Sequence, residues 1–296
     1  MKDHIVRASA VEGTIRAFAA VTTNMVEEAR KIHEASGVAI AALGRTLTAI
    51  AIMSKMSKSE RDVLTIQIKG DGPLGGIVAV SDAEANVRGY INNPSVELPL
   101  NSQGKFDVSG GIGKNGYLNV IRDLGLKEPY VGYVELFTGE VGEDIAYYYA
   151  FSEQIPSVVS LGVLVAPDGS VVNAGGYIIQ LMPGAEEGLV EALENKICSL
   201  KLVTTMLEEG KSPEELLELI LGEIGLEITE KYSCRYLCNC SRERMERNLI
   251  SIGTKDIMEM AVEEHGAELQ CHFCNRKYNF TEDELMSLIS EEEQRN

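Results

Sequence analysis

The residues of this chain best suited to do chemistry are four cysteines in two closely spaced pairs. Cys238 and Cys240 form a C-x-C pair, and Cys271 and Cys274 form a C-x-x-C pair thirty residues further on. Side chains two apart in an extended segment point to the same side, so both sulfurs of a C-x-C can reach one ion. Zn²⁺ prefers a tetrahedron of four ligands, and soft thiolates suit it. The two pairs therefore predict one zinc ion per chain, held by all four cysteines.

The same sulfurs could carry out redox chemistry. Zinc–sulfur bonds of about 2.3 Å place two sulfurs of a tetrahedron roughly 3.8 Å apart, whereas a disulfide needs about 2.05 Å and uses up the thiolate charge. Zinc binding and oxidation therefore exclude each other. A disulfide within a C-x-C would close a small ring, and strained disulfides are labile. Losing a structural zinc removes folding free energy on the order of 10 kcal/mol, so the site could act as a switch.

Other residues near the pairs leave alternatives open. His265 and His272 lie between or beside the pairs and could be ligands, although four cysteines already complete a tetrahedron. Cys234 lies four residues before Cys238 and could replace a ligand or exchange into another disulfide. Cys198 lies among residues with helical apolar spacing, so we expect it to be a small buried hydrophobe.

Two stretches match the glycine pattern of dinucleotide-binding loops, at residues 70–75 and 111–116. Such a loop must follow a strand and begin a helix. Here each is followed by a strand-like run, so we interpret both as hairpin turns. Lys114 is followed by Asn115, and not by Ser or Thr, so the second stretch is not a P-loop either.

The elements before the cysteines predict an α+β fold. Residues 22–56 carry apolar residues at helical spacing and predict two helices with a break at 33–37. Short segments rich in β-branched and aromatic residues then predict an antiparallel sheet. These segments are 63–70, 75–82, 86–93, 116–123, 130–139 and 145–152, followed by a strand–turn–strand at 160–184. Residues 1–183 are therefore expected to form an N-terminal mixed α/β core domain.

Residues 184–232 are expected to form an acidic helical linker. Residues 186–232 hold twelve Glu and four Lys. Ser212, Pro213 and Glu215 form a capping box that predicts the start of a helix. Such short amphipathic helices depend on packing against a neighbour, so the segment could be an ordinary connector or a conditionally folded one.

Residues 233–296 are expected to form a small C-terminal zinc-binding unit. Helical spacing over 254–266 predicts one helix, and 278–289 predicts a strand followed by a helix capped by Thr281 with Glu284. A unit of this size with little apolar material commonly needs a metal or disulfides.

Charge and hydropathy narrow the classes of function and location. The formal net charge of −18 disfavours nucleic acid, which is bound through Lys and Arg, and disfavours an anionic membrane surface. No uninterrupted run of 18 apolar residues is present, and the first residues lack the apolar segment of a signal peptide. We therefore expect a cytoplasmic protein, where clustered cysteines are more often metal-binding or redox-active than structural.

With these features assembled, the sequence resembles the bacterial redox-regulated chaperones known as the heat shock protein 33, or 33 kDa chaperonin, family. The resemblance covers essentially the full chain. It rests on the C-x-C and C-x-x-C pairs, on the acidic segment before them, and on the stretches "AALGRTLTA", "GDGPLGGIVAV", "GGYIIQLMPG" and "CHFCNRKYNF".

The resemblance implies a mechanism without enzymatic turnover. In the reduced, inactive state the four cysteines hold Zn²⁺. Oxidants then form the disulfides Cys238–Cys240 and Cys271–Cys274, zinc is released, and the linker and C-terminal unit unfold. The oxidised protein is expected to form a homodimer. It binds unfolding client proteins without ATP and prevents their aggregation. Clients later pass to ATP-dependent chaperones.

Two other classes remain as alternatives. A zinc-ribbon adaptor or nucleic-acid binder would function with zinc bound, although residues 233–296 carry thirteen acidic and eight basic side chains. A thiol oxidoreductase would use Cys271 and Cys274 as its active pair, but such a pair belongs at a helix start near a βαβ unit.

Overall fold

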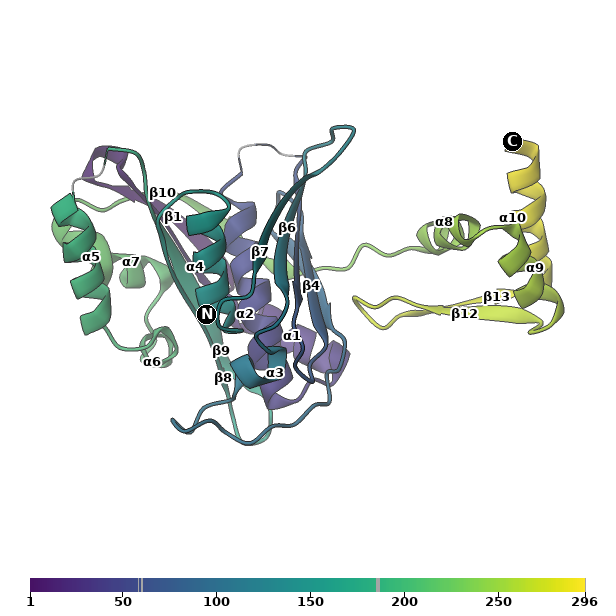
Figure 1. Cartoon of the computed structure of the whole chain (residues 1–296), viewed down its shortest axis with the longest axis horizontal. Coiled ribbons are helices and arrows are strands. Elements are labelled where there is room, and N and C mark those ends of the chain that lie inside the picture. Colours follow the sequence, from purple (N-terminus) through teal and green to yellow (C-terminus); the bar gives the residue numbers. More distant parts are fainter. Residues whose placement is uncertain (58, 60, 185–186, 296) are drawn as a thin grey trace. The chain divides into compact units, whose positions relative to one another are not determined.

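The computed structural model describes residues 1–57, 59, 61–184 and 187–295 (Figure 1). The chain divides into two compact units, Met1–Leu237 and Cys238–Asn296, and each is described by itself. The first holds two large sheets, one mixed and one antiparallel, and the second holds a two-stranded hairpin with helices. The expected α+β class is confirmed.

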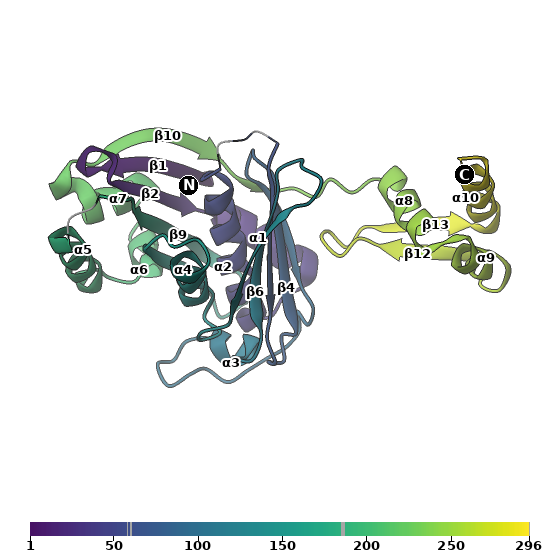
Figure 2. The same cartoon turned by 45° about the horizontal axis from the view of Figure 1, so that its top comes forward.

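The five-stranded sheet of the first unit is antiparallel throughout (Figure 2). Its strands, in spatial order, are β10 (Glu227–Ser233), β1 (His4–Ala10), β2 (Ile15–Val21), β9 (Val171–Leu181) and β8 (Ser157–Val165). The predicted strand–turn–strand at 160–184 corresponds to the hairpin of β8 and β9. Strands β1 and β2 were not predicted, and β10 lies in a segment that we expected to be helical.

The six-stranded sheet is mixed. Strand β11 pairs parallel to β5, and all the other neighbouring strands of this sheet pair antiparallel. Its strands, in spatial order, are β11 (Arg235–Tyr236), β5 (Asn86–Ile91), β4 (Gly76–Ser81), β3 (Val63–Lys69), β6 (Tyr117–Asp123) and β7 (Tyr130–Glu135). Five predicted strand segments, from 63–70 to 130–139, are confirmed. The short β11 anchors the end of the first unit, and the Tyr236 hydroxyl donates to the Gly89 carbonyl at 2.7 Å.

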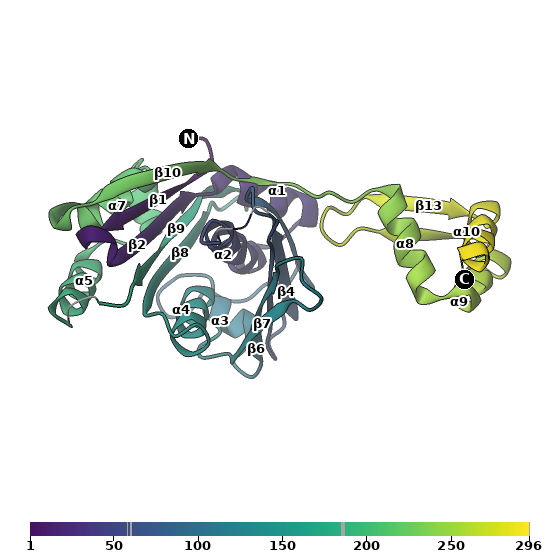
Figure 3. The ribbon, with the colours of Figure 1, turned by 90° about the horizontal axis from the view of Figure 1, so that it is seen from above.

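Helix α2 (Gly37–Ser54) lies between the two sheets (Figure 3). It follows α1 (Thr23–His33), and the break between the two helices confirms the prediction. Ser36 caps α2 by accepting from the Ala39 backbone N–H at 3.3 Å. Its length and hydropathy would suit a membrane span, but 89% of the helix is buried inside the protein, as expected of a core helix.

Two predictions in the first unit are wrong in detail. The strand predicted at 145–152 is wrong, because residues 145–151 belong to helix α4 (Val141–Phe151) and Ser152 is its C-cap. The four apolar residues that this helix buries have helical spacing, namely Val141, Ile145, Tyr148 and Tyr149. The glycine stretch at 70–75 is the expected hairpin turn between β3 and β4. The stretch at 111–116 is not a hairpin turn, because it contains the end of the short helix α3 (Val108–Ile112) and the loop that leads to β6.

Helices cover the outer face of the five-stranded sheet. They are α5 (Glu187–Ser199), α6 (Val203–Glu208) and α7 (Pro213–Leu221), and short 3-10 turns follow β1 at Val11–Gly13 and α7 at Gly222–Ile224. Ser212 and Glu215 form the predicted capping box at the start of α7. Leu216, Leu217 and Leu221 are fully buried in a core shared with β1, β2 and β9.

The second unit is built from α8 (Arg242–Ile252), α9 (Thr254–Val262), the hairpin of β12 (Gly266–Gln270) and β13 (Lys277–Thr281), and α10 (Glu282–Arg295). The predicted helix at 254–266 ends earlier, at Val262, and α8 was not predicted. Thr281 caps α10 with Glu284 as predicted. The small core of this unit holds Leu249, Ile257, Phe280 and Leu285.

Candidate metal centre

The four paired cysteines meet in the second unit. The sulfurs of Cys238, Cys240, Cys271 and Cys274 all lie within 4.8 Å of one another. The Cys238 and Cys271 sulfurs are 3.7 Å apart, and those of Cys240 and Cys274 are 3.3 Å apart. Sulfurs around a tetrahedral zinc ion are separated by roughly 3.8 Å. The group therefore has the dimensions and the soft donors that a zinc ion requires.

The C-x-x-C pair is held by the tight turn between β12 and β13. The N–H groups of Cys274 and Asn275 both donate to the Cys271 carbonyl, at 3.3 and 2.8 Å. The Cys271 N–H donates to the Arg276 carbonyl at 2.9 Å. Asn275 adopts the left-handed conformation that closes the turn, with φ of 56°. These bonds point both sulfurs of the pair to the same side.

The C-x-C pair lies immediately before α8. Ser241 caps this helix by accepting from the Arg244 N–H at 3.4 Å, so the helix starts directly after Cys240. The Arg244 side chain donates to the Asn239 carbonyl at 3.1 Å, which fixes the residue between the two cysteines. The cap and this bond fix the C-x-C segment at the start of α8, and the Arg242 side chain donates to the Asn279 carbonyl of the hairpin at 3.1 Å.

Tyr278 extends the cysteine group beyond its sulfurs. Its hydroxyl donates to the Cys240 sulfur at 3.1 Å. Burial acts to raise the pKa of Cys240, but hydrogen bonds from Tyr278 and from the neighbouring thiols lower that pKa to about 7. Burial raises the pKa of Cys238 and of Cys274. The role of Tyr278 could not be predicted from the sequence, because its contact with Cys240 depends on the position of β13 in the folded hairpin.

The two remaining cysteines lie outside this group. Cys234 is buried in the core of the first unit, where its thiol lies 3.9 Å from the Val21 carbonyl. Burial raises the pKa of Cys234 to about 12, so few thiolates form there. Cys198 is exposed on α5, and the expectation that it is buried is wrong. All six cysteines are free thiols in this structure.

The histidines considered as alternative ligands are not part of the sulfur group. Among the described residues, the group of potential metal ligands contains the four cysteine sulfurs, and no histidine or carboxylate belongs to it. His265 is exposed and lies 3.3 Å from a carboxylate oxygen of Glu282. The site chemistry is therefore that of four thiols.

Comparisons with known proteins agree with this fold and site. The sequence profile of the family described as Hsp33 protein matches residues 3–281. This chain belongs to that family of chaperones, which are not enzymes.

Individual relatives span the whole chain. The 33 kDa chaperonin of Acetivibrio thermocellus is 60% identical and covers 98% of this chain and 97% of its own length. That of Thermoanaerobacter pseudethanolicus is 49% identical over 98% of both chains. The crystal structure of the 33 kDa chaperonin of Thermotoga maritima has a TM-score of 0.91 and 39% identity, and covers 99% of this chain and all of its own.

Proposed function

We propose that this chain is a redox-regulated holdase chaperone that is inactive when reduced and zinc-bound. In this proposal residues 1–183 are a stable core domain, 184–232 a conditional linker and 233–296 the redox-switch unit. Oxidation of the four cysteines activates binding of unfolding proteins without ATP. The observation that carries the proposal is the group of four free sulfurs in a chain that belongs to this family of chaperones.

The proposed metal ligands are Cys238, Cys240, Cys271 and Cys274. When bound, Zn²⁺ would hold all four as thiolates and tie the C-x-C segment to the hairpin. The Tyr278 hydroxyl supports this state, because it donates to the Cys240 sulfur. The donor set contains only sulfur, which favours zinc over a hard cation such as Mg²⁺.

The proposed switch is oxidation to the disulfides Cys238–Cys240 and Cys271–Cys274. Two sulfurs give up two electrons and form one S–S bond, while one hydrogen peroxide molecule takes the electrons and two protons to become two waters. Two peroxide molecules therefore oxidise the whole group. Disulfide sulfurs carry no thiolate charge, so the oxidised group can no longer hold the cation.

Oxidation would also destabilise the second unit. Cys271 is buried in its small core, and the other three cysteines pack against the same core. A structural zinc contributes on the order of 10 kcal/mol to the folding of small units, more than such a core can replace. We infer that the oxidised second unit unfolds.

The client surface is proposed to be the apolar face between the linker helices and the five-stranded sheet. In this structure α5, α6 and α7 bury Leu193, Met206 and Leu217 against that sheet. Helices this short are stable only while they remain packed. Unfolding of residues 184–232 would therefore expose apolar side chains to an unfolding protein.

A light-scattering assay tests the function. Peroxide-oxidised protein at an equimolar ratio should suppress aggregation of a thermally unfolding enzyme in the absence of ATP, and the reduced protein should not. Cys198→Ser removes an exposed thiol outside the group and should behave like the wild type in both states. Equal scattering with the oxidised and the reduced protein contradicts the proposal.

The remaining expectations follow from the same function. The oxidised protein is proposed to form a homodimer and to pass its clients to ATP-dependent chaperones. A reducing cytoplasm is the compartment in which four free thiols persist until an oxidant appears. Sedimentation of the reduced and oxidised forms tests the change in oligomeric state.

A further inference from the structure

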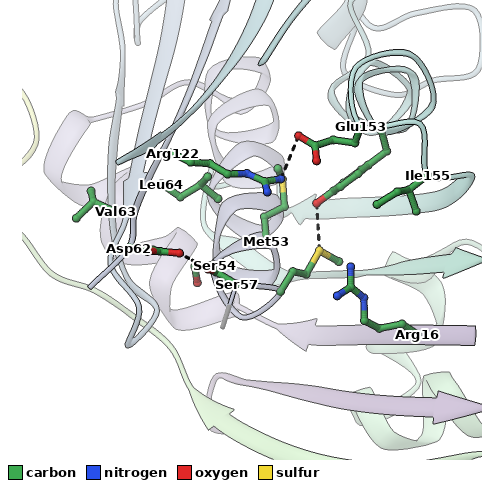
Figure 4. Close-up of a pocket in the computed structure, with 12 residues that line it drawn as sticks. Arg16, Met53, Ser54, Ser57, Asp62, Val63, Leu64, Arg122, Glu153 and Ile155 are labelled. Carbon is green, nitrogen blue, oxygen red and sulfur yellow. Dashed lines mark hydrogen bonds and ion pairs between the residues drawn. The ribbon is translucent and has the colours of Figure 1, made fainter. Parts of the chain in front are cut away.

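The first unit contains a cavity of about 80 Å³ beside the end of α2 (Figure 4). Two arginines, Arg16 and Arg122, and two acidic side chains, Asp62 and Glu153, line it. Their formal charges cancel, and Arg122 already pairs with Glu153 at 3.3 Å. The cavity therefore presents no net charge to a ligand. The edge of the five-stranded sheet presents a surface that oxidation would uncover.

Strand β10 covers the edge of β1 in the five-stranded sheet (Figure 2). The two strands pair antiparallel from His4 with Ser233 to Ser9 with Glu227. Six of the seven side chains of β10 are exposed, and Tyr232 is only half-buried. Since so little apolar side-chain area is buried, main-chain hydrogen bonds to β1 carry most of this contact.

The side-chain contacts between these two strands lie at the surface. The Arg7 guanidinium pairs with Glu230, directly opposite on β10, at 2.7 Å. The Thr229 hydroxyl donates to the Arg7 carbonyl at 3.2 Å. Exposed ion pairs contribute little to stability, so another extended segment could take the place of β10.

Unfolding of the linker would uncover both the edge and one face of β1. Residues 227–232 of β10 lie in the segment 184–232, which the proposed function expects to unfold on oxidation. Their departure would leave N–H and C=O groups along β1 unpaired. Helix α7 belongs to the same segment and packs in one core with Val6, Ala8 and Ala10 of β1. A strand edge with free main-chain groups beside small apolar side chains is a template for pairing with another chain.

We propose that the edge of β1 in the oxidised protein binds an extended segment of an unfolding client, which adds to the sheet as a strand. This binding mode rests on the proposed function, because β1 is uncovered only if the linker unfolds. Main-chain hydrogen bonds can form with any sequence, which suits a chaperone with varied clients. Apolar side chains at alternate positions of the client would pack beside Val6 and Ala8. A client carboxylate opposite Arg7 would replace that of Glu230.

The sequence of β10 makes poor use of this edge, which favours a client over a second copy of the chain. Lys231 lies opposite Val6 and pairs with Glu214 of α7 at 2.6 Å, a partner that is lost when the linker unfolds. The β10 strand of a second copy would place the same charged side chain there. A client segment with valine or isoleucine at this position would instead bury apolar area against Val6.

Fluorescence anisotropy of a labelled peptide tests the proposal on the full chain. The peptide has the sequence of residues 226–233 with the change Lys231→Val, and the unchanged sequence is its matched control. The peroxide-oxidised protein should bind the changed peptide saturably and about tenfold more tightly than the control, because one more apolar side chain is buried. The reduced, zinc-loaded protein should bind neither peptide, since its own β10 occupies the edge at an effective concentration of about millimolar.

N-methylated peptides separate main-chain recognition from side-chain recognition. Methylation at the alternate residues whose N–H groups face β1 should abolish binding, whereas methylation at the other residues should preserve it. In the protein, Arg7→Gln should weaken binding about two- to fivefold, as expected for loss of an exposed ion pair. Arg61→Gln, the same change in an exposed turn before β3, should leave binding unchanged.

Aggregation of a thermally unfolding enzyme is followed with the same oxidised samples. Suppression of aggregation without saturable peptide binding would overturn this site and leave the chaperone function standing. Equal binding of the two methylated peptides would assign recognition to side chains. Binding that is lost as the oxidised protein self-associates would assign the edge to a second copy. Either of these results would also overturn the proposal.

Discussion

At the scale of single residues, the candidate site consists of four sulfurs from two pairs of cysteines, with the Tyr278 hydroxyl bonded to one of them. The pairs are local in sequence, and a metal brings such pairs together whatever lies between them. The spacing of the pairs along the sequence predicts the four sulfurs, but it does not predict which other residues surround them. Tyr278 reaches Cys240 across 38 positions of sequence, and Cys234, only four residues from Cys238, lies in the other unit's core.

Replacing Tyr278 tests whether this neighbour supports the site. Tyr278→Phe removes the hydroxyl that donates to the Cys240 sulfur at 3.1 Å. Partners of this kind typically change metal affinity 10–100-fold, and we expect a loss of about tenfold in zinc affinity. Competition with a chromogenic chelator measures it. Tyr133→Phe, at an exposed position of β7, is the control and should retain wild-type affinity.

At the scale of elements, the predictions succeeded where a local signal agreed with the final packing. The capping box of α7 and the break before α2 are encoded within a few residues. Strand β10 gives no such signal, because its side chains are mostly exposed and do not alternate. It is a strand because it pairs with β1, more than 200 positions away.

Helix α4 shows a conflict between two signals. Its three consecutive tyrosines and Ile145 favour a strand by composition. The residues it buries follow a helical period, with Ile145 four and Tyr148 seven positions after Val141. Periodicity decided the structure, since one face of this segment packs against the core while Phe151 remains exposed.

The cap of α7 offers a test of the proposed linker. Ser212→Ala removes the side chain that accepts from the Glu215 N–H, and the loss of such caps costs about 1 kcal/mol. Hydrogen exchange of the α7 amides in the reduced protein should become about five-fold faster. Ser102→Ala, in the exposed loop after β5, is the matched control. Unchanged exchange in α7 would show that the cap does not stabilise this helix.

Glu27 connects α1 to the start of β9 and should make stability depend on pH. It accepts two hydrogen bonds from Arg30, both at 2.8 Å, and one from the Val171 N–H at 3.0 Å. The bonds from Arg30, with smaller help from Val171, lower the pKa of Glu27 to about 2. Because the folded pKa lies below the unfolded one, this contribution is full above about pH 5 and is lost as the pH falls towards 2.

Denaturant unfolding of Glu27→Gln measures that contribution. The wild type should exceed the variant by about 1–3 kcal/mol at pH 7, and the difference should shrink steadily between pH 5 and pH 2. Glu128→Gln removes an exposed carboxylate from the loop before β7 and controls for net charge. A difference that stays constant over this range would contradict the assigned role of Glu27.

At the scale of the whole molecule, the two units differ in how they are stabilised. The first has an extensive apolar core around α2. The second has a small core that includes one of the clustered cysteines. A change at the sulfurs should therefore destabilise the second unit directly. Within the first unit, we expect residues 1–183 to remain folded through the switch, whereas the proposed linker 184–232 unfolds.

The formal net charge of −18 suits a protein that exposes apolar surface when it is activated. High like charge favours solubility, which suits a chain that exposes apolar surface after activation. The apolar helix α2 stays buried in the first unit and has no part in that exposure. We therefore expect the client surface to lie between the linker helices and the five-stranded sheet, and not around α2.

The most direct test of the central claim is to follow zinc and free thiols together while the reduced, zinc-loaded protein is treated with peroxide. A chromogenic chelator reports released zinc, a thiol reagent reports remaining thiols, and mass mapping identifies the disulfides. The account predicts that one zinc is released per chain in step with the loss of four thiols, as Cys238–Cys240 and Cys271–Cys274 form. Zinc that stays bound after these four thiols are oxidised would contradict it.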